Sequence, residues 1–120
     1  MAEHVVARVG DIPDGGSLIV DVEGRSIGVF NVGGEIFAVR NRCAHQGGPL
    51  CDGAVLSALR AEVLPSGKVR EYWDETTPVV ACPWHGWEYD LRTGALLGDK
   101  SRKVAVYETR VADGEIRVVM

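Results

Sequence analysis

Two short stretches decide how this sequence is interpreted: CAHQGGPL at residues 43–50 and CPWHGWEYD at residues 82–90. Each opens with a cysteine, and a histidine follows it as C-x-H in the first stretch and C-x-x-H in the second. Thiolate and imidazole groups suit zinc or iron–sulfur clusters, and two such pairs supply the four ligands that either would need. The sequence therefore predicts a metal centre. Its candidate ligands are Cys43, His45, Cys82 and His85.

The tight spacing of the first pair bears on the kind of metal centre. In an extended loop, side chains two positions apart leave the backbone on the same side with roots ~6.5 Å apart. That span suits ligands to two adjacent metal ions more naturally than two ligands to one ion. A loop can also curl and bring both side chains onto a single zinc, so both kinds of centre stay open at this point.

Composition limits the classes of protein that fit. The chain has 120 residues, of which 46% are hydrophobic and 25% charged, and this suits one soluble domain over residues 1–120. A net charge of −4 argues against nucleic acids and anionic membranes as partners. No stretch has the length of a membrane span and no secretory leader is visible, so we expect a cytoplasmic protein. Three cysteines cannot form a disulfide framework.

Most of the remaining sequence predicts an all-β fold. Apolar and polar residues alternate in short runs, and glycine or aspartate separates the runs. Glycine accepts the positive φ of tight turns, so pairs such as Asp113-Gly114 predict hairpins. We therefore expect an antiparallel meander whose base sheets span about 1–40 and 99–120. The expected strands are residues 4–9, 17–22, 25–31, 35–40, 104–109 and 115–119.

The middle of the chain, about 41–98, has a different character, because glycine, proline, tryptophan, cysteine and histidine concentrate there. Residues 54–64 have apolar positions that fit a short helix, which Pro65 would end. Further strands are expected at 68–73, 78–82 and 87–91. Cys51 lies close to the first pair, but a lone cysteine is more often a small buried apolar residue than a ligand.

The two quoted stretches resemble the cluster-binding loops of Rieske 2Fe-2S proteins, and the strand order on either side resembles the β-scaffold of that family. The resemblance implies a Rieske-type antiparallel β-sandwich with a smaller cluster-binding β-subdomain. It also implies one 2Fe-2S cluster, in which each loop gives a cysteine to the first iron and a histidine to the second. Cys43 and Cys82 would then bind one iron, and His45 and His85 the other.

One departure from the family pattern is the length between the two loops, where 36 residues separate His45 from Cys82. The extra sequence, about 54–77, is expected to form an insertion with a helix-like turn and a β-excursion. A surface specific to a partner and a decorative insertion are both open interpretations of it.

The ligand set also bears on the reduction potential. A cluster with two thiolates and two neutral imidazoles is less negative than one with four thiolates, so it accepts an electron more easily. Respiratory members of the family carry a loop disulfide and a serine at positions that are Gly48, Trp84 and Trp87 here. Of the family's hydrogen-bond donors to the cluster, only a possible tyrosine donor has a counterpart here, at Tyr89. We therefore expect a centre of low potential within the Rieske range, as in ferredoxins of bacterial oxygenases.

The resemblance and the histidine count together predict the role. An oxygenase needs a second iron with two more histidines, and only His4 remains, so we expect no enzyme but an electron-transfer component. A Rieske-type ferredoxin would carry single electrons from a flavin-dependent reductase to a terminal oxygenase. We expect transient docking through the tips of the two loops, at His45 to Leu50 and Pro83 to Trp87, and a monomer.

Other classes of function also fit the four ligands. An iron–sulfur or zinc-bearing module could serve as an interaction or sensor domain, or as the small subunit of a larger reductase. Visible absorption with a titratable one-electron step would separate these, because a zinc protein is colourless.

Overall fold

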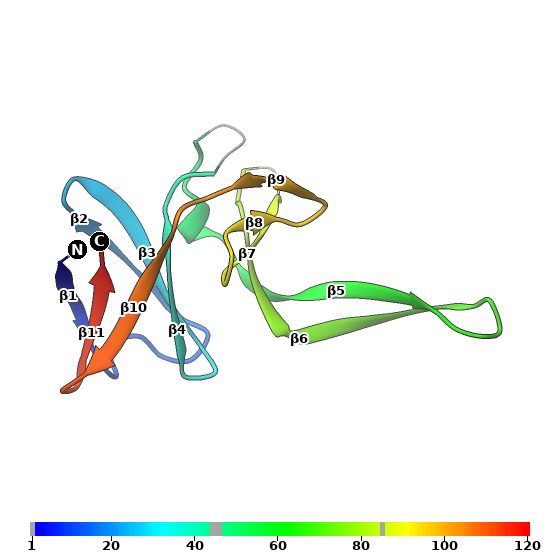
Figure 1. Ribbon diagram of the computed structural model, residues 1–120, viewed down its shortest axis with the longest axis horizontal. Helices are drawn as coiled ribbons and strands as arrows, with labels where there is room; N and C mark the ends of the chain where they lie inside the picture. The colour runs from blue at the N-terminus through cyan, green and yellow to red at the C-terminus, as the bar shows by residue number, and fades with distance from the viewer. Residues whose placement is uncertain (1, 44–46, 85) are drawn as a thin grey trace.

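The computed structural model describes residues 2–43, 47–84 and 86–120, which form two antiparallel sheets (Figure 1). The six-stranded sheet has the order β1-β11-β10-β4-β3-β2, and the five-stranded sheet has the order β5-β6-β7-β8-β9. The expected all-β fold is confirmed. The strands of the first sheet are β1 (Glu3–Arg8), β2 (Ser17–Val22), β3 (Arg25–Val32), β4 (Glu35–Arg40), β10 (Val106–Ala112) and β11 (Glu115–Val119). Those of the second are β5 (Val55–Val63), β6 (Val69–Ala81), β7 (Glu88–Asp90), β8 (Ala95–Leu96) and β9 (Asp99–Lys103).

The six-stranded sheet follows the alternation seen in the sequence. Its turn at Asp113-Gly114 has positive φ at both residues, 55° and 74°, which is the conformation that matches the twist of a two-residue hairpin. β1 pairs with β11, so the two ends of the chain lie side by side in one sheet. The only helical segment among the described residues is a short 3₁₀ turn, η1 (Leu50–Asp52), which has neither the length nor the apolar run to cross a membrane.

Buried side chains form two clusters. One lies within the six-stranded sheet and includes Ile27, Val29 and Val118. The other joins the two sheets, because it contains Phe30 and Val39 of the first sheet together with residues of β6 and β7. We call this second set the shared cluster. Its buried members are Phe30, Phe37, Val39, Cys43, Leu50, Cys51, Val80, Cys82, Tyr89, Leu91, Leu96 and Val104.

A polar contact also ties the sheets together. The guanidinium of Arg92, in the turn after β7, donates two hydrogen bonds to the carboxylate of Glu35 at the start of β4, one of them 2.8 Å long. The same guanidinium lies 5.1 Å from the ring centre of Phe37. The hydrogen bond from Arg92 lowers the pKa of Glu35, so this carboxylate stays charged. The ion pair is exposed, so it adds little to the free energy of unfolding. Its role is to hold the turn after β7 against the start of β4.

The region between the loops differs from the sequence prediction. The helix expected over 54–64 is wrong: these residues form β5, which pairs with β6 from Val55 opposite Val80 to Val63 opposite Val69. The strands expected at 68–73 and 78–82 form a single strand, β6. Its pairing with β5 is irregular, because Ser57 lies opposite Pro78 whereas the next residue, Ala58, lies opposite Asp74. The second part of the base sheets was expected to begin at residue 99. Residues 99–103 instead form β9, which pairs with β8 in the five-stranded sheet, because the turn at Gly98 folds this segment back.

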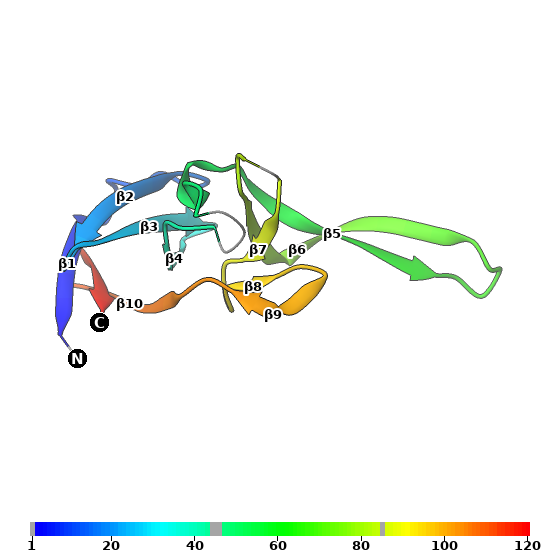
Figure 2. The same cartoon turned by 90° about the horizontal axis from the view of Figure 1, so that it is seen from above.

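The β5–β6 hairpin extends well beyond the rest of the molecule (Figures 1 and 2). It accounts for an elongated shape, with principal dimensions of 52 × 31 × 23 Å. We call its outer part, residues 58–74, the arm. Apart from the turn at its tip, the arm consists of two strands that are paired only with each other, since β7 pairs with β6 only from Val79 to Ala81.

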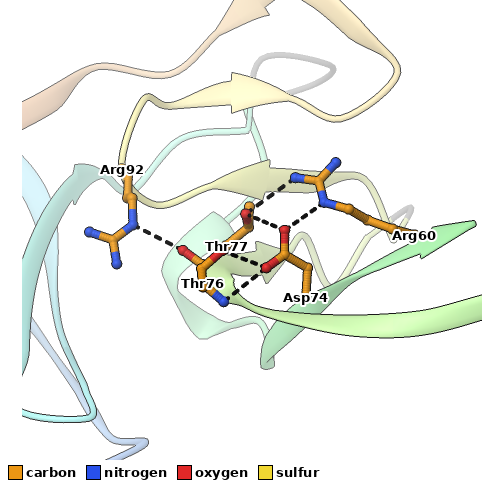
Figure 3. A network of polar contacts seen from close by, with 5 residues as sticks. All are labelled: Arg60, Asp74, Thr76, Thr77 and Arg92. Carbon is orange, nitrogen blue, oxygen red and sulfur yellow. Dashed lines mark hydrogen bonds and ion pairs between the residues drawn. The ribbon is translucent and has the colours of Figure 1, made fainter.

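A polar network anchors the base of the arm (Figure 3). The carboxylate of Asp74 accepts hydrogen bonds from the hydroxyls of Thr76 and Thr77 and from the Nε of Arg60, the last at 2.6 Å. The carbonyl of Thr76 in turn accepts a 3.2 Å bond from the Nε of Arg92. The Thr76 hydroxyl, followed by Arg60, holds the pKa of Asp74 well below its usual range. The irregular part of β6 is thereby tied to both β5 and the turn after β7.

Candidate metal centre

The two cysteines of the predicted centre come together in the structure. Cys43 follows β4 of the six-stranded sheet, and Cys82 follows β6 of the five-stranded sheet. Both side chains are buried, and both belong to the shared cluster. The two predicted histidine ligands, His45 and His85, lie outside the described residues. The structure thus shows the two cysteine side chains entering one apolar region from different sheets.

The two cysteines make the same pair of backbone hydrogen bonds with the residues that follow them. The amide of Gly47 donates a 2.8 Å hydrogen bond to the carbonyl of Cys43, and the amide of Gly86 donates a 2.8 Å bond to the carbonyl of Cys82. In each loop the cysteine amide donates to the carbonyl of the residue after that glycine, at 2.9 and 2.8 Å. Both glycines have φ of 70°, which favours glycine over residues with a side chain. This repeated turn was not predicted from the C-x-H and C-x-x-H pairs.

The two loops also fit against each other. A Cβ placed on Gly48 would lie 2.7 Å from Cδ2 of Trp84, so the backbone of the first loop lies directly against the indole of the second. Trp84 is still 56% exposed on its other side. Trp87 is partly buried against the shared cluster, and the guanidinium of Arg102 lies 5.4 Å from its ring centre. One tryptophan therefore joins the loops while presenting a surface to solvent, and the other packs inward.

Tyr89 of β7 contacts the sulfur of the first loop. Its side chain is fully buried, and its hydroxyl lies 3.3 Å from Sγ of Cys43. When that sulfur is a metal-bound thiolate it has no proton, so the tyrosine hydroxyl must be the donor. This is the place at which the sequence analysis expected a tyrosine donor.

Tyr89→Phe should lower the reduction potential of the centre. A hydrogen bond to the sulfur stabilises the reduced, more negative state more than the oxidised one, so its loss favours oxidation. One such bond is worth about 1 kcal/mol, which for a one-electron step corresponds to about 40 mV. A redox titration followed by visible absorption measures the shift. Phenylalanine keeps the ring in place, so an unchanged potential in a variant with full iron content would contradict the role of the hydroxyl.

The third cysteine has a different environment. Cys51 lies on η1 in the shared cluster, where its amide donates a 2.8 Å bond to Oδ1 of Asn41 and its Sγ lies 3.7 Å from the carbonyl oxygen of Val39. A Cβ on Gly28 would lie 2.3 Å from this sulfur, so β3 passes directly beside it. Burial raises the pKa of Cys51 to about 12, which keeps it a neutral thiol. The expectation that Cys51 is a buried core residue is confirmed.

The described residues fit the cysteine half of the predicted centre. Thiolates suit the sulfur side of an iron–sulfur cluster, and the buried pair with a hydroxyl donor supplies that environment. Within residues 2–43, 47–84 and 86–120 no group of three or more histidine, cysteine, aspartate or glutamate side chains could hold a metal ion. The third histidine, His4, lies on β1 with its Nε2 3.8 Å from Glu23.

Comparisons with known proteins support this picture. The family model of the Rieske [2Fe-2S] domain matches residues 2–108. The 3-phenylpropionate/cinnamic acid dioxygenase ferredoxin subunit of Escherichia coli (strain K12) is 29% identical over 109 residues, which are 90% of this chain and 84% of the relative. The ferredoxin of carbazole 1,9a-dioxygenase from Nocardioides aromaticivorans IC177 has a similar structure, with 26% identity, a TM-score of 0.73 and coverage of 99% and 98%.

A third similar structure comes from Mycobacterium tuberculosis and is assigned as the small subunit of an NADH-dependent nitrite reductase. It has a TM-score of 0.77 with 21% identity, and the match covers 98% of this chain and 93% of that one. At this identity the likeness shows the shared fold alone.

Proposed function

The chain belongs to the Rieske [2Fe-2S] domain family, and on this premise we propose that it is a ferredoxin that carries single electrons from a reductase to a terminal oxygenase. One observation carries the proposal: two buried cysteines occupy matching turns in a chain that is similar over nearly its whole length to ferredoxin subunits of dioxygenases. The role is that of an electron-transfer component rather than of an enzyme.

The proposed ligand set has Cys43 and Cys82 on one iron and His45 and His85 on the other. When bound, the 2Fe-2S cluster supplies reversible one-electron chemistry at a potential above that of an all-thiolate centre. The shared cluster keeps water from the two sulfur atoms, because both cysteines are buried in it. When Cys43 binds iron as a thiolate, the hydroxyl of Tyr89 donates a hydrogen bond to its Sγ and so helps set the potential.

The tips of the two loops form the proposed docking face. Pro83 and Trp84 are exposed there, and the indole of Trp84 covers the backbone of the first loop at Gly48. Electron-transfer encounters use small interfaces, below about 1,200 Å², and an exposed aromatic ring is a common contact in an interface. We propose a flavin-dependent reductase as the donor, a terminal oxygenase as the acceptor and the cytoplasm as the compartment.

The proposal is tested on anaerobically purified protein. Iron and acid-labile sulfide analysis, followed by an electron paramagnetic resonance spectrum of the reduced form, establishes the centre. The reduced protein is then mixed with a purified terminal oxygenase, and reoxidation of the ferredoxin together with product formation is followed. A preparation with zinc and no iron rejects the centre, and an iron protein that supplies no electron to any oxygenase rejects the carrier role.

His85→Cys is expected to keep a 2Fe-2S chromophore and to lower its potential. The substitution replaces a neutral ligand by an anionic one, and the added negative charge disfavours reduction. Rieske centres lie between about −150 and +300 mV and plant-type all-cysteine centres near about −400 mV, so we expect a drop on the order of 100 mV or more. Redox titration of variant and wild type measures it. An intact variant with the potential of the wild type would contradict His85 as a ligand.

A second candidate is the small subunit of a larger reductase. The fold alone does not separate the two roles, because the structure assigned as a nitrite reductase small subunit has the same fold over nearly the full length of both chains. A subunit of this kind would remain bound to its large subunit, whereas a carrier would separate from each partner between turnovers. Size-exclusion chromatography of the protein isolated from its native cells distinguishes a stable large complex from a free ferredoxin.

A further inference from the structure

The arm has two chemically different faces. Residues directly opposite each other in an antiparallel pair point to the same face, so the pairing of β5 with β6 assigns every side chain to one face. One face contains ion pairs within the chain, Arg70 with Glu62 at 2.6 Å and Arg60 with Asp74 at 2.6 Å. The other face is almost entirely apolar. It consists of Leu59 opposite Trp73, Ala61 opposite Glu71, and Val63 opposite Val69.

The apolar face is open to solvent. Exposed fractions are 53% for Leu59, 74% for Val63, 63% for Val69 and 61% for Trp73. A ribbon of two strands is marginally stable at best in water, and three or more strands are needed for independent stability. A further strand paired with the arm would therefore stabilise it.

The outer edge of β5 is available for such a strand. β5 is the terminal strand of the five-stranded sheet. The amide of Leu64 donates a 2.8 Å hydrogen bond to the carbonyl of Lys68, so Leu64 turns its backbone groups toward β6. Because these groups alternate along an antiparallel strand, Leu59, Ala61 and Val63 turn their amides and carbonyls away from β6. An incoming strand would find these groups at the open edge.

We propose that this edge pairs with β5 of a second copy, antiparallel and about a two-fold axis at Ala61. In that register Arg60 lies opposite Glu62 of the second copy, and Leu59 lies opposite its Val63. Every contact is repeated by the symmetry, so the patch is self-complementary, as an interface between identical chains requires. The two arms would then form a four-stranded ribbon with the two bodies at its opposite ends, because the arm projects from one side of each body (Figures 1 and 2).

Charge favours a second copy as the occupant. On the charged face, Glu62 would then lie between Arg70 of its own chain and Arg60 of the second copy. Positive and negative side chains therefore alternate across the new contact as they do within the chain. On β6, a two-fold axis at the outward-facing Glu71 would instead place two carboxylates opposite each other. The proposed dimer departs from the monomer expected from the sequence, in which neither the arm nor its register is visible.

Two proline substitutions form a matched test. Ala61→Pro removes an amide hydrogen that faces the proposed seam, and Glu71→Pro removes one that faces the opposite edge of the same hairpin. Residues 61 and 71 are cross-strand partners, and neither amide is used within the hairpin, so both variants perturb the arm alike. Iron-loaded wild type and both variants are compared by sedimentation equilibrium from about 10 µM to about 1 mM. The visible spectrum checks that the cluster-binding body is unchanged.

The expected result is a concentration-dependent dimer of wild type, because the seam is short. Ala61→Pro should weaken dimerisation at least about tenfold, and Glu71→Pro should stay within about threefold of wild type. A wild type that is monomeric at every concentration overturns the proposal, as does equal weakening by both prolines. If wild type is monomeric and Ala61→Pro alone slows reduction of an oxygenase, the edge serves that partner and not a second copy, which also overturns the proposal.

Discussion

Cys82→Ser should abolish the metal centre, with iron and acid-labile sulfide falling below about a tenth of the wild-type content. The side chain of Cys82 is buried in the shared cluster, so no solvent ligand can replace it without opening the junction of the two sheets. A serine hydroxyl does not ionise near neutral pH and binds iron far less well than a thiolate. Anaerobic purification followed by metal analysis measures the loss, and the reduced sample should lack the electron paramagnetic resonance signal.

Cys51→Ser is the matched control, because it makes the same chemical change at a cysteine buried in the same cluster. The raised pKa of Cys51 keeps it a neutral thiol, and its sulfur lies against the backbone of β3 and β4 rather than in either loop. This variant should keep the iron content and spectrum of the wild type. Iron loss in Cys51→Ser, or full iron content in Cys82→Ser, would show that the proposed ligand set is wrong.

The framework strands were predictable from the sequence because alternation and turn residues act locally. The strands β2 and β4 begin and end at the predicted residues, and the hairpin at Asp113-Gly114 is present. The segment 54–64 was not predictable in this way. Its apolar positions fit a helix as well as a strand. The segment forms a strand because residues 69–81 supply a partner strand that pairs with it along its whole length. Long-range pairing of this kind overrides local preference.

The site was predictable in part for a similar reason. Cysteine and histidine at these spacings have few uses, so the two cysteines that the structure brings into one buried cluster could be singled out from the sequence alone. The contact between Tyr89 and Cys43 depends on β7 lying beside β6 and on both sheets sharing one core, which only the tertiary structure shows. The repeated glycine turns at Gly47 and Gly86 could have been noticed, since each glycine follows its cysteine by four positions.

Gly53→Ala should strongly destabilise the protein and weaken its hold on the cluster. Gly53 follows η1, and a Cβ there would lie 1.7 Å from the carbonyl oxygen of Ala81, the residue directly before Cys82. Backbone atoms cannot give way as side chains do, so the end of β6 would have to move away from η1. We expect a loss of about 3 kcal/mol in the free energy of unfolding. Denaturant unfolding of the iron-loaded protein measures it, and the iron content should fall in parallel.

Gly98→Ala separates this collision from ordinary backbone strain. Gly53 has φ of −77°, which any residue adopts, so the whole cost of its substitution is the collision. Gly98 has φ of 89° and open space around its Cα, so its substitution adds only conformational strain, about 1 kcal/mol. Gly53→Ala should therefore be the more damaging change although its backbone angles are ordinary. Equal effects of the two substitutions would mean that η1 and β6 can move apart, and that the junction behind Cys82 is less rigid than the buried packing implies.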